Sequence, residues 1–436
     1  MKEFLKKIII KIITWESRLV LARFRPKIIA VVGSVGKTST KDAVYSGLKN
    51  ILYIRKNQKS FNSEIGVPLT ILGLANAWGN YGLWFWNVIR GFLTIFSFNY
   101  PKWLILELGI DRPGDMKKYA SWIKPDVVIL TSFPDVPVHV EYFESPEDVI
   151  AEKKEILKSL KYDGALVLNA DDPKVFAVAE EMKSKIKKVV TFGLSTKADV
   201  SISNMDVIYE NFDNHQVPTG VSFKGNYNGN SVPIALHGAL GVQHIYPMAA
   251  AMATALVLDL PILSVVDALH YHQVPKGRMN IIEAINNSVL IDDSYNASPE
   301  SMSKAIEVLG QLETNSSKIA ILGDMLEIGK YTVREHRRIG EMVKNQGINF
   351  LFAIGLRSKD MALAAVESGM SEDHVFHFDS SEEAIETVLK YIKPYSLILI
   401  KGSQGARMEK ISGAIIKDQD NKDDLLVRQE GEWERR

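Results

Sequence analysis

The chain has 436 residues, of which 46% are hydrophobic and 24% charged, and its 52 lysines and arginines balance 52 acidic residues. This length leaves room for roughly three domains, and the composition is that of a globular protein. The neutral balance argues against a dedicated nucleic-acid-binding protein, which normally carries a basic surplus. The absence of cysteine excludes disulfides, thiolate metal sites, iron–sulfur clusters and a cysteine nucleophile. We therefore expect a cytoplasmic protein, since that compartment is reducing.

The first 27 residues predict a basic amphipathic helix. They contain eight basic residues against Glu3 and Glu16, a net charge of +6, with apolar residues between them. Two interpretations are open: a helix docked on the first domain, or an interfacial anchor on anionic lipid at the inner face of the membrane. Lys11 interrupts the apolar run 8–14, so we expect no cleaved signal peptide. No uninterrupted apolar run reaches the roughly 18 residues that span a bilayer.

Short apolar runs then alternate with helical segments, a pattern that predicts open α/β sheets. Two series of runs are typical of buried parallel strands: 28–32, 103–108, 126–131 and 165–168, then 289–291, 318–322, 350–354 and 397–400. Between the series lie a Gly- and Asn-rich, β-leaning stretch at about 200–240 and a helical run at 244–258. We place the boundary between two large domains near 275–278.

Two further segments are distinctive in composition. Residues 75–102 hold three of the seven tryptophans among other aromatic residues, which predicts either an ordinary buried helix pair or an apolar surface for membrane contact. The residues after about 417 are strongly charged, and we expect them to be frayed.

The clearest chemical motif follows the strand at 28–32. Gly33-Ser34-Val35-Gly36-Lys37-Thr38 leads directly into a helix, in the short GxxGK[ST] form of the phosphate-binding loop, because Val31 stands where the longer form has glycine. Glycines let backbone N–H groups curl around phosphates, and the helix N-terminus adds its positive dipole end. Lys37 would neutralise phosphate charge and Thr38 would ligate Mg²⁺. The motif predicts nucleotide binding but does not separate a GTPase, a kinase and a ligase.

Several other strand ends carry polar residues. Glu107 ends the strand at 103–108, where a carboxylate can hold Mg²⁺, and His139 lies in the loop after the strand at 126–131. By default, a lone loop histidine is solvated, and so is a helical lysine pair such as Lys153 and Lys154. Further transitions from strand to loop occur at 291–302, 321–329 and 398–409.

Taken in order, these motifs resemble the Mur ligase family, whose members form amide bonds with ATP. The branch that adds D-alanyl-D-alanine to the UDP-N-acetylmuramoyl tripeptide is the most similar. Its marks are SFNSEIGVPLT (60–70), DDSYNASPESM (292–302), LGDMLEIG (322–329) with His336 downstream, and KGSQGARME (401–409). The resemblance covers about residues 28–416.

The resemblance implies a division of the chain. A short basic helix (1–27) precedes a P-loop ATPase central domain with a parallel sheet (28–277), a Rossmann-like C-terminal α/β domain (278–416) and a charged tail (417–436). It also implies a monomer that uses ATP and Mg²⁺, with a muropeptide precursor and D-alanyl-D-alanine as substrates.

The resemblance further implies roles for individual residues. Gly33, Ser34, Gly36, Lys37, Thr38 and Ser39 would hold the phosphates. Thr38 and Glu107 would bind one Mg²⁺, with His139 and a carbamylated Lys153 at a second metal. Arg278 would reach the phosphates from the domain junction, and Asp293 would contact the nucleotide when the domains close. Asn296, Ser403 and Arg407 would bind the incoming amine.

Four departures from the family pattern keep alternatives open. Only 32 residues precede Gly33, too few for the usual UDP-binding domain, and Ser132 follows Thr131 where the family has asparagine. The adenine segment reads Gln243-His244-Ile245-Tyr246-Pro247, and Gln404 replaces an arginine. These changes motivate two alternatives: a membrane-surface ligase with a lipid-linked or other non-UDP substrate, and a nucleotide-binding regulator without catalysis.

Overall fold

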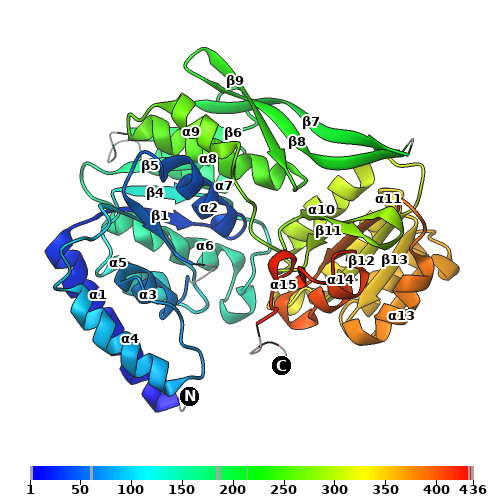
Figure 1. Ribbon diagram of the computed structural model, residues 1–436, viewed down its shortest axis with the longest axis horizontal. Coiled ribbons are helices and arrows are strands. Elements are labelled where there is room, and N and C mark those ends of the chain that lie inside the picture. Colours follow the sequence, from blue (N-terminus) through cyan, green and yellow to red (C-terminus); the bar gives the residue numbers. More distant parts are fainter. Residues whose placement is uncertain are drawn as a thin grey trace.

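The protein consists of two β-sheet units that lie side by side, with a pair of N-terminal helices at one corner (Figure 1). The computed structural model describes residues 3–58, 62–182, 186, 188–213, 215–430 and 433. All eight predicted strands are present within two residues of the expected limits, so the predicted α/β class is confirmed. Continuous apolar runs form these strands because helices cover both faces of a parallel sheet.

The first unit is a nine-stranded sheet with the order β2-β3-β1-β4-β5-β6-β7-β8-β9. Its pairs are parallel from β2 to β7, and β7, β8 and β9 form an antiparallel meander that accounts for the stretch 200–240. The strands are β1 (Lys27–Val32), β2 (Ile54–Lys56), β3 (Trp103–Glu107), β4 (Val127–Leu130), β5 (Ala165–Asn169), β6 (Lys188–Gly193), β7 (Val200–Phe212), β8 (His215–Tyr227) and β9 (Asn230–His237).

Helices surround this sheet. α2 packs against α8 and α9, and α8 corresponds to the helical run expected at 244–258. The helices are α1 (Glu3–Phe24), α2 (Lys37–Leu48), α3 (Gly66–Leu72), α4 (Tyr81–Thr94), α5 (Asp115–Ala120), α6 (Pro146–Lys154), α7 (Pro173–Met182), α8 (Val242–Val257) and α9 (Ile262–Leu269), with 3₁₀ turns η1 (Val140–Tyr142) and η2 (Glu155–Ser159).

The second unit is a six-stranded sheet with the order β10-β11-β15-β12-β13-β14, parallel except for the β10–β11 pair. The strands are β10 (Asn280–Ala284), β11 (Ser288–Asp293), β12 (Lys318–Gly323), β13 (Phe350–Ile354), β14 (Val375–Phe378) and β15 (Leu397–Lys401). The helices are α10 (Pro299–Gln311), α11 (Thr332–Asn345), α12 (Lys359–Glu367), α13 (Ser381–Tyr391), α14 (Glu409–Ile415) and α15 (Lys422–Leu425), with 3₁₀ turns η3 (Ile285–Asn287), η4 (Gly329–Tyr331), η5 (Glu372–His374) and η6 (Gln404–Ala406).

The β7–β8 hairpin reaches across to the second unit (Figure 1). The ring of His215 stacks on Tyr395 with 3.8 Å between centroids, and the Tyr209 hydroxyl accepts a hydrogen bond of 3.0 Å from the Glu313 amide. These contacts lie far along the hairpin from β6 and fix the mutual position of the two sheets. The carboxyl ends of β1 and β11 therefore face a common junction.

The first helix docks on the protein along one side only. α1 packs against α3 and α4, and it buries Ile9, Ile13 and Val20. Phe4 and Trp15 on its other side are 76% and 53% exposed. The docked interpretation is thus correct for one face, and the other face is open.

The structure corrects the expectation of a buried helix pair at 75–102. This segment forms one helix, α4, which buries only Trp84, Asn87 and Gly91. Val88 and Ile89 are half-buried, and the other large apolar side chains of the helix are exposed. Apolar residues on both faces of a helix predict that it is buried, but only one face of α4 packs against other described residues.

The expectation of a frayed tail is wrong for residues 417–430. Leu426 is buried, and Arg428 donates hydrogen bonds to the carbonyls of Ser294 (2.6 Å) and Tyr295 (3.0 Å) and to Glu409 (2.7 Å). These bonds engage both terminal nitrogens of a buried guanidinium, which explains why a highly charged segment is ordered here.

Candidate active site

The glycine-rich loop joins β1 to α2 at the middle of the nine-stranded sheet. A Cβ on Gly33 would lie 1.9 Å from Oγ1 of Thr131, so no larger residue fits there. Gly36 has a φ of 82°, in the left-handed region that favours glycine. The Thr131 hydroxyl donates to the Val35 carbonyl (2.7 Å), and the Ser34 amide donates to the Ser132 carbonyl (2.8 Å). The end of β4 therefore holds the loop in shape.

Two lysines converge on Ser34 of this loop. Lys37 donates to the Ser34 carbonyl (3.1 Å), and Lys153 donates to the Ser34 hydroxyl (2.6 Å). Desolvation lowers the pKa of Lys37, although Glu107 opposes the shift. Burial and the neighbouring charge of Lys37 lower the pKa of Lys153 well below its usual range. Within the described part of the chain, neither ammonium group has an ion pair with a carboxylate, so the pair is arranged to receive an anion.

Glu107 ends β3 beside the start of α2. Its Oε1 accepts hydrogen bonds from the Thr38 hydroxyl (3.1 Å) and from the Asn62 amide (2.8 Å), and Lys41 lies 3.6 Å from Oε2. Oε2 is buried and has no hydrogen-bond donor among the described residues. Ser39 is also buried in the first turn of α2. A carboxylate oxygen with spare lone pairs next to a hydroxyl is a donor set that suits Mg²⁺.

His139 lies at the junction between the two units. Its Nδ1 lies 2.8 Å from Oε2 of Glu327 in the second unit, and its Nε2 lies 3.7 Å from Oδ1 of Asp111. The neighbouring imidazole of His139 lowers the pKa of Glu327. Over the described residues, no group of three or more His, Asp and Glu side chains is arranged to hold a metal ion. His139 therefore joins the two units in this conformation.

Acidic residues end β11 on the opposite side of the junction. Asp293 accepts a hydrogen bond of 2.6 Å from Lys401, and burial raises the pKa of this carboxyl. Asp292 accepts a hydrogen bond of 2.9 Å from Ser412, and burial raises its pKa to about 6. The guanidinium of Arg278 stacks 4.3 Å above the Tyr295 ring. The charge of Arg278 acts on both Lys37 and Asp293, which places it between the two halves of the site.

The residues expected on the amine side mainly support other groups. Ser403 accepts a hydrogen bond from the Leu326 amide (2.9 Å), and Asn296 accepts one from the Ala297 amide (2.9 Å). Arg407 is paired with Glu409 at 2.6 Å and lies over the Trp433 ring at 5.6 Å. A cavity opens between the two units. Of the four described residues Asn296, Ser403, Gln404 and Arg407, Gln404 alone lines it.

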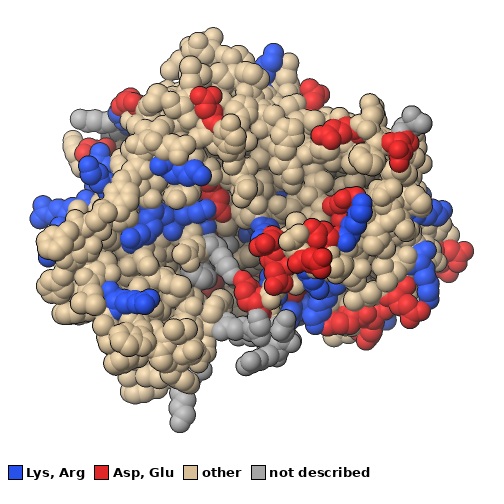
Figure 2. All heavy atoms as spheres, viewed as in Figure 1, with Lys and Arg blue, Asp and Glu red and all other residues tan. Residues whose placement is uncertain are grey.

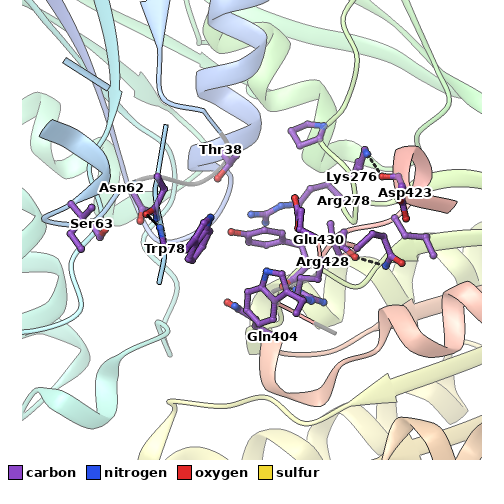
Figure 3. Close-up of a pocket in the computed structure, with 18 of the residues that line it drawn as sticks. Thr38, Asn62, Ser63, Trp78, Lys276, Arg278, Gln404, Asp423, Arg428 and Glu430 are labelled. Carbon is purple, nitrogen blue, oxygen red and sulfur yellow. Dashed lines mark hydrogen bonds between the residues drawn. The ribbon is translucent and has the colours of Figure 1, made fainter. Parts of the chain in front are cut away.

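That cavity has a volume of about 1120 Å³ and opens between the units (Figure 3). Thr38, Asn62, Ser63 and Trp78 line one side, and Lys276, Arg278, Gln404 and Arg428 line the other. Lys6 of α1 and Trp84 of α4 also contribute to the wall. The cavity therefore runs from the start of α2 to the N-terminal helix pair.

A second cavity of about 860 Å³ lies on the other flank of the glycine-rich loop. It is lined by Val35 and Gly36 of the loop, by Gln243, Tyr246 and Pro247 of α8, and by Glu300 and Lys304 of α10. Ser132 lies 3.4 Å from Glu300 across the junction. His244 points away into the core, where burial lowers its pKa to about 3. The atypical segment 243–247 thus borders a cavity beside the phosphate loop.

Sequence reasoning missed three residues of this site: Lys41, Asn62 and Glu327. Asn62 and Glu327 lie inside the segments 60–70 and 322–329 that carry the family resemblance, but no local spacing ties either of them to Glu107 or His139. Lys153 and Lys154 also differ more than their adjacency indicates. Lys153 is buried at the loop, whereas Lys154 is paired with Glu181 at the surface.

Comparison with known families gives two matches that follow one another along the chain. Residues 31–255 match the Mur ligase middle domain, and residues 277–404 match the Mur ligase, glutamate ligase domain. The first match alone covers more than half of the chain.

Individual relatives extend the likeness over most of the chain. A UDP-N-acetylmuramoyl-tripeptide–D-alanyl-D-alanine ligase of Bacillus subtilis is 26% identical over 391 residues, which is 90% of this chain and 76% of that protein. The Escherichia coli ligase of the same name is 28% identical over 397 residues (89% and 76%). Two solved structures share the fold: MurF of Acinetobacter baumannii (TM-score 0.75, 23% identity, 92% and 79% covered) and MurF of Thermotoga maritima in complex with ADP (0.74, 21%, 95% and 84%).

Proposed function

The chain belongs to the Mur ligase family, and from that premise we propose that it uses ATP to join D-alanyl-D-alanine to a UDP-N-acetylmuramoyl tripeptide. The observation that carries the proposal is the desolvated ammonium of Lys37 in the glycine-rich loop, which has no ion pair with a carboxylate within the described residues. A buried ammonium of this kind is stabilised when polyphosphate oxygens enter the loop. Because the reaction consumes ATP, we place it on the cytoplasmic side, and we propose a monomer.

The proposed reaction has two steps. The γ-phosphoryl group of ATP moves to the substrate carboxylate, which gives an acyl phosphate and ADP. The amine of D-alanyl-D-alanine then attacks the acyl carbon, phosphate leaves, and the nitrogen loses a proton. Catalysis of this kind depends mostly on positioning and on the neutralisation of negative charge.

The residues of the site fit these needs. The amides of Gly33 to Gly36 and the ammonium of Lys37 would bind the phosphates, and Thr38 with Glu107 would hold Mg²⁺. Oε2 of Glu107, which accepts no hydrogen bond among the described residues, supports this assignment. When bound, Mg²⁺ neutralises charge that develops on the phosphate oxygens. Arg278 would add a positive charge from the junction, and closure of the two units would exclude water from the acyl phosphate.

We further propose that Lys153 is carbamylated in the active enzyme. Its lowered pKa increases the share of neutral amine, which is the form that adds CO₂ to give a carbamate and a proton. A carbamate would supply anionic oxygen for a metal ion beside His139. Carbon-13 NMR of protein incubated with labelled bicarbonate tests this: a carbamate resonance present in the native chain should be absent from Lys153→Met.

The amine would enter the larger cavity, whose wall includes Arg278 and Gln404. Asn296, Ser403 and Arg407 would support that wall from behind, since Arg407 packs over Trp433, which also lines the cavity. Asp293 would approach the nucleotide from the end of β11.

Phosphate release from Mg·ATP tests the proposal, with UDP-N-acetylmuramoyl tripeptide and D-alanyl-D-alanine supplied together and separately. Release that requires both substrates and disappears in Lys37→Ala supports the ligase. Absence of release under every condition contradicts it and favours a nucleotide-binding regulator.

A second candidate substrate is favoured by one observation. Lys6 and Trp84 of the N-terminal helix pair line the larger cavity, so the cavity extends to a corner of the molecule with exposed apolar side chains. The same chemistry on a lipid-linked muropeptide would use that geometry. Replacement of the UDP substrate by its lipid-linked form in the release assay separates the two.

A further inference from the structure

The outer face of α4 is apolar and has no neighbour among the described residues. Its exposed side chains recur with helical spacing and continue past the helix end: Phe85 (64% exposed), Trp86 (56%), Phe92 (46%), Leu93 (58%) and Phe96 (54%). Monomeric proteins rarely leave a contiguous patch of this kind in water.

The inner face of α4 is fixed, which keeps the outer face outside. The Trp84 indole donates to the Trp78 carbonyl (2.8 Å), and the Asn87 amide donates to the Ala75 carbonyl (2.8 Å). Gly91 allows close contact with α1, because a Cβ there would lie 2.2 Å from Oε2 of Glu16. The exposure of Phe85 and Trp86 is therefore a consequence of packing on the other side.

The neighbouring helix supplies charge of one sign. Between residues 4 and 27 the sole acidic residue is Glu16, which is buried, and residues 73–102 contain no Asp or Glu. The exposed charged residues of these segments are all basic: Lys7, Lys11, Arg18, Arg23, Arg25, Lys27, Arg90 and Lys102. In Figure 2 the corner over α1 and α4 shows tan and blue surface without red.

We propose that α4 and the basic side of α1 form a docking surface for a bilayer that contains anionic lipids. Aromatic and aliphatic side chains enter the interface between headgroups and acyl chains, and lysines and arginines meet the lipid phosphates. Charge complementarity selects this occupant, because an apolar protein partner would not require an all-basic border. No helix in the described part of the chain is long and apolar enough to cross a membrane, so the contact is at the surface.

Co-sedimentation of the full chain with vesicles tests the docking surface. We expect binding to phosphatidylcholine vesicles that contain phosphatidylglycerol, and little binding to pure phosphatidylcholine. The double variant Phe85→Glu/Trp86→Glu should reduce the partition coefficient at least about tenfold. The matched control Leu263→Glu/Tyr271→Glu changes two exposed apolar residues in and near α9 and should stay within about twofold of the native chain.

A second set of variants tests the electrostatic attraction between α1 and the lipid phosphates. Lys7→Glu/Lys11→Glu should weaken binding to the anionic vesicles, whereas Lys344→Glu/Lys359→Glu in the second unit should not. Added salt should weaken native binding, because it screens the attraction to lipid phosphates.

Three results would overturn the proposal: no binding to anionic vesicles, equal binding to neutral vesicles, or equal loss in the control variants. Light scattering tests whether a second copy of the chain covers this face instead. A native dimer that Phe85→Glu/Trp86→Glu converts to monomers would identify the face as a contact between copies and would also overturn the proposal. Circular dichroism and the phosphate-release assay establish that each variant is folded. Vesicle binding needs no ATP chemistry, so its outcome is independent of the proposed ligase reaction.

Discussion

Lys153 and Lys401 are both buried lysines at the junction, but their surroundings differ. Lys401 ends β15 and holds Asp293 at 2.6 Å and the Asn296 carbonyl at 3.0 Å. Lys153 lies in the last turn of α6, and the hydroxyl of Ser34 at 2.6 Å is its hydrogen-bond partner among the described residues. The first ammonium is neutralised by the fold itself, and the second is not.

The difference indicates what each side of the junction is built to do. A buried charge without a counterion costs stability, and a protein retains it where a ligand later supplies the opposite charge. The nine-stranded unit therefore leaves two amines uncompensated at its glycine-rich loop, Lys37 for the phosphates of a nucleotide and, by the carbamylation proposed above, Lys153 for CO₂. The six-stranded unit presents an internally compensated pair, which positions the end of β11 without the help of a ligand.

Replacement of Lys153 should separate activity from stability most clearly. We expect Lys153→Met to reduce ATP-dependent phosphate release by about 10²- to 10³-fold, because the carbamate proposed as a metal ligand beside the phosphates cannot form. The melting temperature should be unchanged or higher, because no carboxylate is left unpaired. Lys154→Met is the matched control, since Lys154 pairs with Glu181 at the surface, and it should keep near-native activity. A stability loss in Lys153→Met would contradict the comparison.

Replacement of Lys401 should have the opposite profile. We expect Lys401→Met to lower the free energy of unfolding by about 3 kcal/mol, because it leaves the Asp293 carboxylate buried and unpaired. Denaturant unfolding at neutral pH measures this loss. The double variant Lys401→Met/Asp293→Leu should recover most of it, since both charges are then gone. If the double variant is no more stable than the single one, the pair does not neutralise itself in the way described.

The two sides of the site were also unequally predictable from sequence. The glycine-rich loop is a local motif, so its strand, glycines, Lys37 and Thr38 follow from neighbouring residues. The parallel strands were predictable for a similar reason, because burial on both faces makes each one a continuous apolar run.

Contacts across the junction were not predictable. The approach of Glu327 to His139 depends on how two separate sheets meet, and no spacing within the chain encodes it. The prediction of a buried helix pair at 75–102 was wrong for another reason. An apolar pattern shows a tendency to be buried, but it does not show whether a neighbouring element is present to cover the outer face of α4. The prediction of a frayed tail was wrong because it relied on the charged composition of the segment. Two residues, Leu426 and Arg428, anchor the tail in spite of that composition.

Glu16 offers a third kind of buried charge, one with neither an internal partner nor an expected ligand. Burial between α1 and α4 raises its pKa to about 7 from 4.5, and its Oε2 has no hydrogen-bond donor among the described residues. The folded state therefore holds the proton more tightly than the unfolded state. The free-energy cost of burying the ionised carboxylate is absent below pH 4.5, grows as the pH rises, and is complete above about pH 7. We expect Glu16→Gln to raise the free energy of unfolding by about 2 kcal/mol at pH 8.

The pH dependence is the decisive part of that measurement. Denaturant curves of the native chain and Glu16→Gln should converge toward pH 4.5, where both carry a neutral side chain at this position. A gain that is equal at both ends of the pH range would mean that the substitution acts through packing against Gly91 rather than through charge.

The contact between His139 and Glu327 should have the smallest effect, because it joins the two units through partly exposed groups. The two side chains are 28% and 41% exposed, and pairs of that kind contribute about 1 kcal/mol or less. We expect Glu327→Gln to raise the KM for ATP by no more than about fivefold and to leave kcat nearly unchanged, since it favours the open arrangement without touching the phosphates. Glu141→Gln, in the adjacent turn, makes the same change of charge without the bond to His139 and should have no effect. A large fall in kcat would instead place Glu327 among the residues that contact the reacting groups. The six-stranded unit would then present a charged group to the substrates, contrary to the comparison above.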